Sequence, residues 1–137
     1  MSSSLERVDL AFLNQTEFNY DPARARQAII ETLDQHHFTR SVTIELMLVE
    51  AVAMKKLNQE YRQKDYVADV LSFPHWPDLT TLATIEAEPL SLGSIVVCPA
   101  VAETACLENQ RTPEEEIDFY VAHSTLHLIG IHHEGDL

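Results

Sequence analysis

Large aliphatic residues occupy every second position from Val42 to Leu48, and this alternation limits the possible folds more than any other feature of the sequence. A period of two residues is typical of a β-strand with one buried face. Further short apolar segments occur along the chain, and segments with helical periodicity separate several of them. The expected strands cover 8–13, 41–49, 69–74 and 92–98, and the expected helices cover 21–36, 50–61, 99–107 and a segment that begins at Pro113.

The order of these segments predicts a fold of the α/β (α+β) class. We expect a mixed four-stranded sheet packed with helices, the last of which is buried against the sheet. The segment 75–91 shows no clear period and is interpreted as a long loop between two strands. A chain of 137 residues can bury one core without disulfides, so residues 1–137 are expected to form a single domain.

Three histidines near the end of the chain suggest a metal site. His123 and His127 are four residues apart, so on a helix both imidazoles project from one face. Gly130 can leave the helix through a left-handed conformation, which would allow the chain to bring His133 to the same point. Three neutral nitrogen ligands with a fourth position open are typical of catalytic zinc, although other divalent transition metals also accept imidazole.

The residues before the histidines predict where their helix begins. Thr112 is a suitable N-cap, Pro113 fits the first turn, and the acidic run 114–116 suits the positive end of the helix dipole. Histidines on such a helix can also be ordinary core or surface residues. That simpler interpretation leaves the third histidine beyond Gly130 unexplained, so we favour a metal-binding helix near the C-terminus.

The charge balance excludes one class of function and leaves another open. The chain has 22 acidic and 9 basic residues and a formal net charge of −13, which argues against indiscriminate nucleic-acid binding. Four of the basic residues nevertheless fall within ten positions, namely Lys55, Lys56, Arg62 and Lys64. This cluster fits a solvated helix face and a phosphate-binding surface equally well.

Apolar runs and cysteines indicate the compartment. No apolar run approaches the ~18 residues of a membrane helix, and the first residues lack the apolar segment of a signal peptide. Cys98 and Cys106 are too few for a disulfide framework and are interpreted as reduced packing residues. A cytoplasmic protein with no membrane contact is expected.

The histidine spacing also resembles that of the metzincin peptidases. Those enzymes carry a glutamate directly after the first histidine, and it acts as the general base. Ser124 occupies this position here, and a serine cannot accept the proton of water at neutral pH as a carboxylate does. A zinc metallopeptidase-like hydrolase is therefore an alternative function, but it lacks its usual base.

Four motifs together resemble the YbeY-type endoribonucleases, which are rRNA maturation factors. They are Asn58-x-x-x-Arg62, Asp69-Val-Leu-Ser-Phe-Pro74, Leu92-Gly93-x-Ile95 and the segment that carries the three histidines. The resemblance implies a single-strand endoribonuclease that binds one zinc-like ion. It further implies a role in the maturation of small-subunit ribosomal RNA and in ribosome quality control.

The resemblance also implies roles for individual residues. The metal ligands would be His123, His127 and His133, and the functional arginine would be Arg62. A guanidinium is suited to stabilising the charge that develops on phosphate oxygens during RNA cleavage. Our hypothesis is that Arg62 contacts the reacting phosphate and that neighbouring phosphates are contacted by Lys55, Lys56 and Lys64. The expected partners are single-stranded or ribosomal RNA and the small ribosomal subunit or its associated proteins. A non-catalytic ribosome-associated module with a structural metal is the other alternative.

Overall fold

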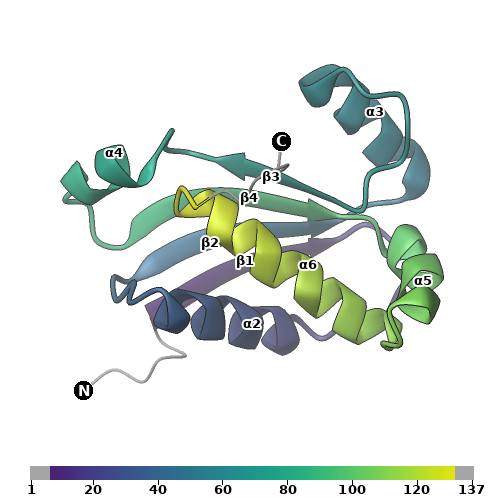
Figure 1. The fold of residues 1–137 in the computed structure, drawn as a ribbon, viewed down its shortest axis with the longest axis horizontal. Helices are drawn as coiled ribbons and strands as arrows, with labels where there is room; N and C mark the ends of the chain where they lie inside the picture. The colour runs from purple at the N-terminus through teal and green to yellow at the C-terminus, as the bar shows by residue number, and fades with distance from the viewer. Residues whose placement is uncertain (1–6, 132–137) are drawn as a thin grey trace.

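A mixed sheet forms the centre of the molecule. The computed structural model describes residues 7–131. Its four strands lie in the order β1-β2-β4-β3, with β1, β2 and β4 parallel and β3 antiparallel to β4 (Figure 1). The strands are β1 (Val8–Asn14), β2 (Val42–Leu48), β3 (Val70–Pro74) and β4 (Leu90–Val97). The predicted fold class and all four predicted strands are confirmed.

The central strand β2 has the alternation expected from its sequence. Val42, Ile44, Leu46 and Leu48 are each at most 1% exposed, and they face the main core. Residues of the two neighbouring strands, β1 and β4, pair with these residues. Leu10 of β1 pairs with Ile44, and Ile95 of β4 pairs with Leu46. The strict period of two therefore comes from burial of one face of this strand.

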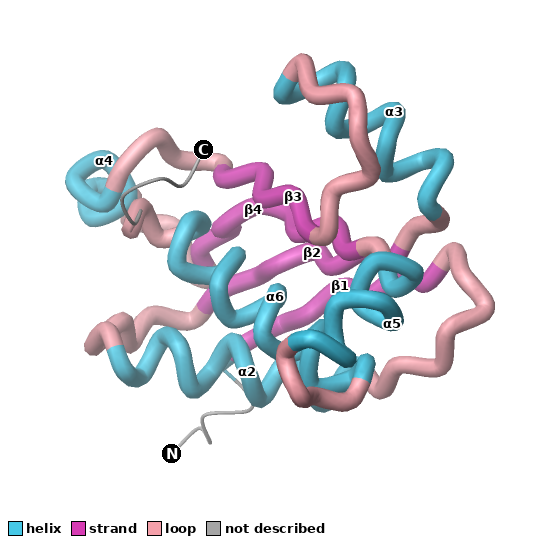
Figure 2. The backbone as a smooth tube through the Cα atoms, turned by 45° about the vertical axis from the view of Figure 1, so that its right-hand side comes forward, coloured by secondary structure: helices cyan, strands magenta, loops and turns pink. Residues whose placement is uncertain are grey.

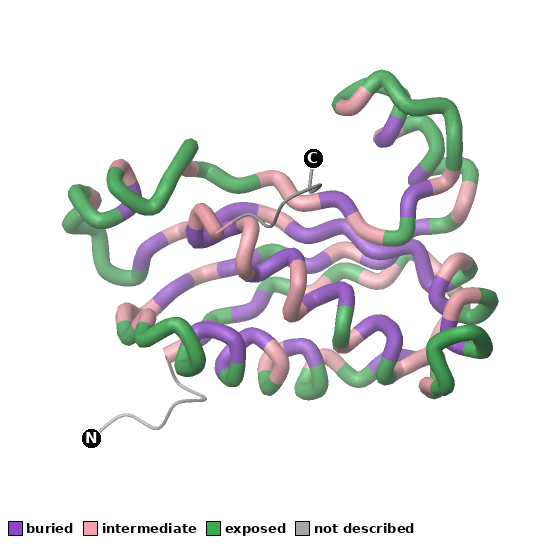
Figure 3. Tube along the Cα trace, viewed as in Figure 1, coloured by how far each residue is buried: buried purple, intermediate pink, exposed green. Residues whose placement is uncertain are grey.

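Five helices surround the sheet within the described residues. They are α2 (Pro22–Gln35), α3 (Ala51–Arg62), α4 (Leu79–Thr84), α5 (Pro99–Glu108) and α6 (Pro113–Leu128). Helices α2 and α6 lie side by side across one face of the sheet (Figures 1 and 2). The turns that face the strands carry most of their buried residues (Figure 3).

Helix α6 is packed against the sheet as predicted. Ile117, Val121 and Leu128 are at most 1% exposed and belong to the main core. At its first turn Thr112 and Glu115 form a reciprocal capping box, in which each backbone N–H donates to the side chain of the other residue over 2.8 and 3.1 Å. The predicted start of this helix is therefore confirmed.

Helix α3 packs on the opposite face of the sheet and stands apart from α2 and α6 (Figure 2). Its buried Met54 belongs to a second apolar cluster with Leu71 of β3 and Val96 of β4. Neighbouring strand residues point to opposite faces, so Val96 faces this cluster while Ile95 faces the main core. This packing holds the first turn of α3 against the sheet.

The interpretation of 75–91 as a loop without regular structure is wrong. The segment contains helix α4, and β4 begins at Leu90. Asp78 caps α4 by accepting a hydrogen bond of 2.7 Å from the Thr81 N–H, and Leu82 is buried in the main core. A helix of six residues is too short to show a repeated apolar period, so tertiary packing stabilises it instead.

Other expectations about burial are met. Cys98 and Cys106 are free thiols and are at most 2% exposed, in agreement with their interpretation as packing residues.

Among the helices formed by residues 7–131, none combines the length and the apolar character needed to cross a bilayer.

Candidate functional site

A pocket of about 720 Å³ lies between the end of α3, strand β3 and helix α6. It brings together residues that are distant in the sequence, because α3 approaches from one side of β3 and α6 from the other. The polar and charged residues that line it are Tyr61, Arg62, Tyr66, Asp69, Ser72, Tyr120, His123 and His127. Three of the predicted site residues, Arg62 and two histidines, therefore share one cavity.

The two imidazoles of α6 lie on consecutive turns and line the pocket together. The ring centres of His123 and His127 are 4.9 Å apart, with an angle of 55° between the ring planes. Two imidazoles that bind one zinc ion at about 2.1 Å per nitrogen place their ring centres roughly 5 Å apart. The described pair therefore fits a shared divalent ion.

The third predicted ligand, His133, lies outside the described residues. Within residues 7–131, no three histidine, cysteine or carboxylate side chains are grouped closely enough to hold an ion. The three-histidine site is consequently still a prediction.

The chain leaves α6 as expected. Gly130 has a φ of +85°, and the Ile131 N–H donates a hydrogen bond of 2.9 Å to the Leu126 carbonyl. A Cβ atom at position 130 would lie 2.5 Å from the backbone nitrogen of Leu79 in α4. The bend thus needs glycine for two reasons, its left-handed conformation and its close contact with α4.

Arg62 is the last residue of α3, and the motif residue Asn58 helps to place it. Asn58 is fully buried one turn before Arg62, and its side-chain amide donates a hydrogen bond of 3.0 Å to the Tyr66 carbonyl. Gln63 then ends the helix in a left-handed conformation. The motif Asn58-x-x-x-Arg62 therefore couples a buried anchor for the following loop to an arginine at the pocket.

The predicted lysines do not line this pocket. Lys55, Lys56 and Lys64 are all exposed, and the Lys55 ammonium lies 3.7 Å from an oxygen of Asp65. They lie on α3, which carries Arg62, or just after it. Contacts of these lysines with phosphates outside the pocket stay a prediction.

Ser124 has a packing role. Its side chain is fully buried, and its hydroxyl forms a hydrogen bond with the hydroxyl of Ser72 in β3. This contact joins α6 to the strand that forms one wall of the pocket. A buried hydroxyl engaged in this way does not replace the catalytic glutamate of a peptidase.

Asp69 and Tyr120 were not among the predicted site residues, although both line the pocket. Asp69 is the first residue of the motif Asp69-Val-Leu-Ser-Phe-Pro74, and its place in that motif could have identified it as a site residue. Burial raises the pKa of the Tyr120 phenol, and the nearby charge of Asp69 raises it further. Tyr120 is therefore a neutral hydrogen-bonding group over the whole physiological pH range.

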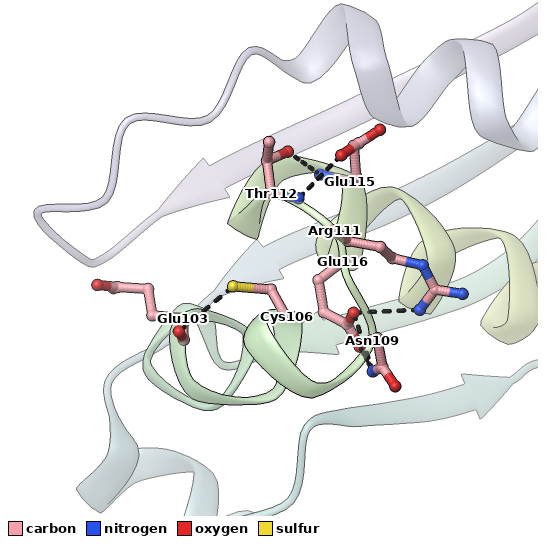
Figure 4. Close-up of polar contacts among 7 residues, drawn as sticks. All are labelled: Glu103, Cys106, Asn109, Arg111, Thr112, Glu115 and Glu116. Carbon is pink, nitrogen blue, oxygen red and sulfur yellow. Dashed lines mark hydrogen bonds and ion pairs between the residues drawn. The ribbon is translucent and has the colours of Figure 1, made fainter.

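A buried ionic cluster supports the start of α6 (Figure 4). The Glu116 carboxylate accepts hydrogen bonds of 3.0–3.1 Å from the Asn109 amide and the Arg111 guanidinium. Burial alone would raise the pKa of Glu116, but these hydrogen bonds outweigh it and lower the pKa below its ordinary value. Arg111 in turn lies over the ring of Phe119, 4.2 Å from its centre.

Replacing this carboxylate should destabilise the protein in a pH-dependent way. Glu116→Gln removes a charge that two side chains contact, so we expect the free energy of unfolding in urea to fall by about 1.5–3 kcal/mol at pH 7. Because folding lowers the pKa, the stabilisation is present above the ordinary glutamate pKa of about 4.3 and is lost as the pH falls through the lowered value. The difference between variant and wild type should therefore shrink in acid. The exposed Glu108→Gln serves as the control, and equal stability of all three proteins at pH 7 would contradict the role of Glu116.

Comparisons with known proteins identify relatives of this chain. The family model described as "Endoribonuclease YbeY" matches residues 12–136. The Endoribonuclease YbeY of Clostridioides difficile is 36% identical over 113 residues, which cover 82% of this chain and 72% of the relative. That of Nautilia profundicola is 33% identical over 126 residues, or 91% of this chain and 78% of the relative.

A solved structure has the same fold. The solution structure of TM1509 from Thermotoga maritima superimposes with a TM-score of 0.54 at 27% identity, and the match covers 91% of this chain and 75% of that one. The family match, the curated relatives and the shared fold lead to one conclusion: the chain belongs to the YbeY endoribonuclease family.

Proposed function

We propose that this protein is a metal-dependent endoribonuclease that cleaves single-stranded RNA in the maturation of small-subunit ribosomal RNA and in ribosome quality control. The observation that supports this most directly is the shared pocket, which joins the guanidinium of Arg62 to the imidazoles of His123 and His127. A guanidinium and two imidazoles that can bind a metal ion lie in one open cavity. This combination suits a reaction in which negative charge accumulates on a phosphate.

The proposed cofactor is one zinc ion or another divalent transition metal, held by His123, His127 and His133. When bound, such an ion polarises a phosphoryl oxygen or lowers the pKa of a water molecule. The residues of the chain supply the rest of the site. Arg62 binds and orients the scissile phosphate and stabilises its developing charge, and the side chain of Asp69 lines the same pocket.

The two alternative functions receive less support. A metallopeptidase would need a base after the first histidine, but Ser124 is buried and hydrogen-bonded to Ser72. A purely structural ion would have a closed coordination shell. The histidines instead line a cavity of about 720 Å³ that reaches from α6 to α3.

RNA is the proposed substrate, and ribosomal RNA with the small subunit or its associated proteins is the proposed setting. The chain has a formal net charge of −13, so we infer that the pocket selects its RNA locally rather than by general attraction. We further propose that the protein acts in the cytoplasm, where such substrates are made.

Elemental analysis is the experiment that tests the metal site. We expect about one zinc or other divalent transition-metal ion per wild-type chain and a large loss of metal in His127→Ala, because two ligands bind an ion far less tightly than three. The variant should also lose RNA cleavage. All proteins should be prepared without a histidine tag or chelating resin.

His36→Ala is the matched control for this measurement. His36 is exposed at the end of α2 and does not line the pocket, so its removal should leave the metal content unchanged. Full metal content in His127→Ala, or equal loss in both variants, would contradict the proposed site. Absence of RNA cleavage by metal-loaded wild-type protein would contradict the proposed activity.

A further inference from the structure

The exposed aromatic residues of this protein are gathered at one place. Seven large apolar side chains are exposed among the described residues, and three of these are aromatic. They are Tyr61, Tyr66 and Phe119, with 62%, 50% and 49% of their surface exposed. All three line the pocket that contains Arg62 and the two histidines. Scattered exposed apolar residues need no explanation, but three aromatic rings around one pocket do.

Contacts with less exposed neighbours hold two of these rings in position. Tyr61 meets Phe73 of β3 edge to face, with ring centres 5.1 Å apart and an angle of 78° between the planes. This geometry is favourable for aromatic pairs and restrains the Tyr61 ring, yet most of its surface stays accessible.

Phe119 is held by the ionic cluster at the start of α6. The Arg111 guanidinium lies 4.2 Å from the centre of its ring, and the same guanidinium is 3.1 Å from the carboxylate of the buried Glu116. The His123 ring is nearly parallel to Phe119, at an angle of 18° with centres 6.3 Å apart, and about half of the Phe119 surface stays exposed. The ring is therefore both exposed and fixed in direction.

The third ring, Tyr66, stands on the loop that follows α3. Its backbone carbonyl accepts the hydrogen bond from the fully buried Asn58. The loop is thus tied to the same helix that carries Tyr61 and Arg62. Three separate anchors keep three aromatic residues at the edge of one pocket.

From this arrangement we propose that Tyr61, Tyr66 and Phe119 form an aromatic platform on which the unpaired bases next to the reacting phosphate stack. This inference rests on the proposed RNA-cleaving function and names how the same site selects its substrate. Aromatic rings bind any base through its flat face, but only when the base is free of a duplex. The platform therefore recognises single strands without reading a particular sequence.

The charge distribution strengthens the argument. Arg62 is the one lysine or arginine among the residues that line the pocket within 7–131, and the chain as a whole carries a formal net charge of −13. Binding that depended on many phosphate contacts would need a basic groove. Stacking of bases on aromatic rings supplies affinity without a basic groove.

The test measures binding of a ten-nucleotide, fluorescently labelled 2′-O-methyl RNA strand by anisotropy, and a gel confirms that the strand stays intact. Tyr61→Leu and Phe119→Leu keep apolar bulk but remove the aromatic face, and each should weaken binding about tenfold. Phe119→Tyr should bind like wild type. Leu107→Ala, which changes an exposed apolar residue outside the pocket, is the control.

A scan with abasic nucleotides separates stacking from other effects. Removing a base that stacks on Tyr61 should weaken binding to the wild type about tenfold but should add little to the loss in Tyr61→Leu. The dependence of binding on salt should be the same in wild type and in both leucine variants, because no phosphate contact is removed. Aromatic variants that bind every strand like wild type, or abasic strands that bind like the intact strand, would overturn the platform.

The same experiment distinguishes the two proposals. If the leucine variants bind and cleave normally while cleavage still requires Arg62, the platform is wrong and the proposed function stands. If the metal-loaded wild type neither binds nor cleaves single-stranded RNA, both proposals fail.

Discussion

Arg62→Ala is expected to lower the rate of single-stranded RNA cleavage by about 100-fold or more while the bound metal stays unchanged. The side chain lies in the pocket with His123 and His127, where a guanidinium can contact a phosphate that has gained charge. Loss of one fixed donor at such a position typically costs about 10²–10³ in rate. The measurement is cleavage of a labelled RNA strand under single-turnover conditions, together with elemental analysis of each preparation.

Two further variants show whether the planar guanidinium is needed. Arg62→Lys keeps the charge but loses the forked donor geometry, so it should recover only part of the rate. Arg26→Ala removes an arginine of α2 that does not line the pocket and should cleave RNA like wild type. Full activity of Arg62→Ala, with metal bound, would rule out a role for this residue in stabilising the transition state.

Gly93→Ala is expected to have the largest effect on stability, lowering the free energy of unfolding by roughly 2–4 kcal/mol. Gly93 has a φ of +132°, a conformation that a side chain strains, and its Cβ position would lie 2.2 Å from the carbonyl oxygen of Phe73. Since both atoms belong to paired strands, a side chain at position 93 can fit only if β3 moves away from β4.

Urea unfolding of Gly93→Ala beside Ser94→Ala measures this effect. Ser94 is the next residue, and its hydroxyl donates a single hydrogen bond of 3.0 Å to Glu45, so its removal should cost about 1 kcal/mol or less. The fraction of Gly93→Ala that folds should also bind RNA less well, because β3 forms one wall of the pocket. Wild-type stability of Gly93→Ala would mean that the two strands separate without cost.

Much of the fold could be predicted because its elements have clear periods. The alternation in β2 comes directly from burial of one face, and the capping box at Thr112 is a short-range signal that packing does not override. Helix α4 could not be found in this way. Its six residues hold too few apolar positions for a period, and the burial of Leu82 depends on distant residues.

The site was predictable only in part. The spacing of His123 and His127 places both rings on one face of any helix, so their proximity follows from local geometry. No local feature of the sequence predicts that Arg62, on the other side of β3, lies close to these histidines. The aromatic residues at the pocket were missed because Tyr61 and Phe119 look like ordinary surface residues of two different helices, and their common location exists only in three dimensions.

The way α6 is secured at both ends has a consequence for any ion that the protein binds. The capping box fixes its first turn, and Gly130 rests against α4 just beyond its last. The backbone that carries the two imidazoles is thus preorganised. An ion that binds His123 and His127 would therefore meet two ligands whose backbone is already in place, at a small entropic cost.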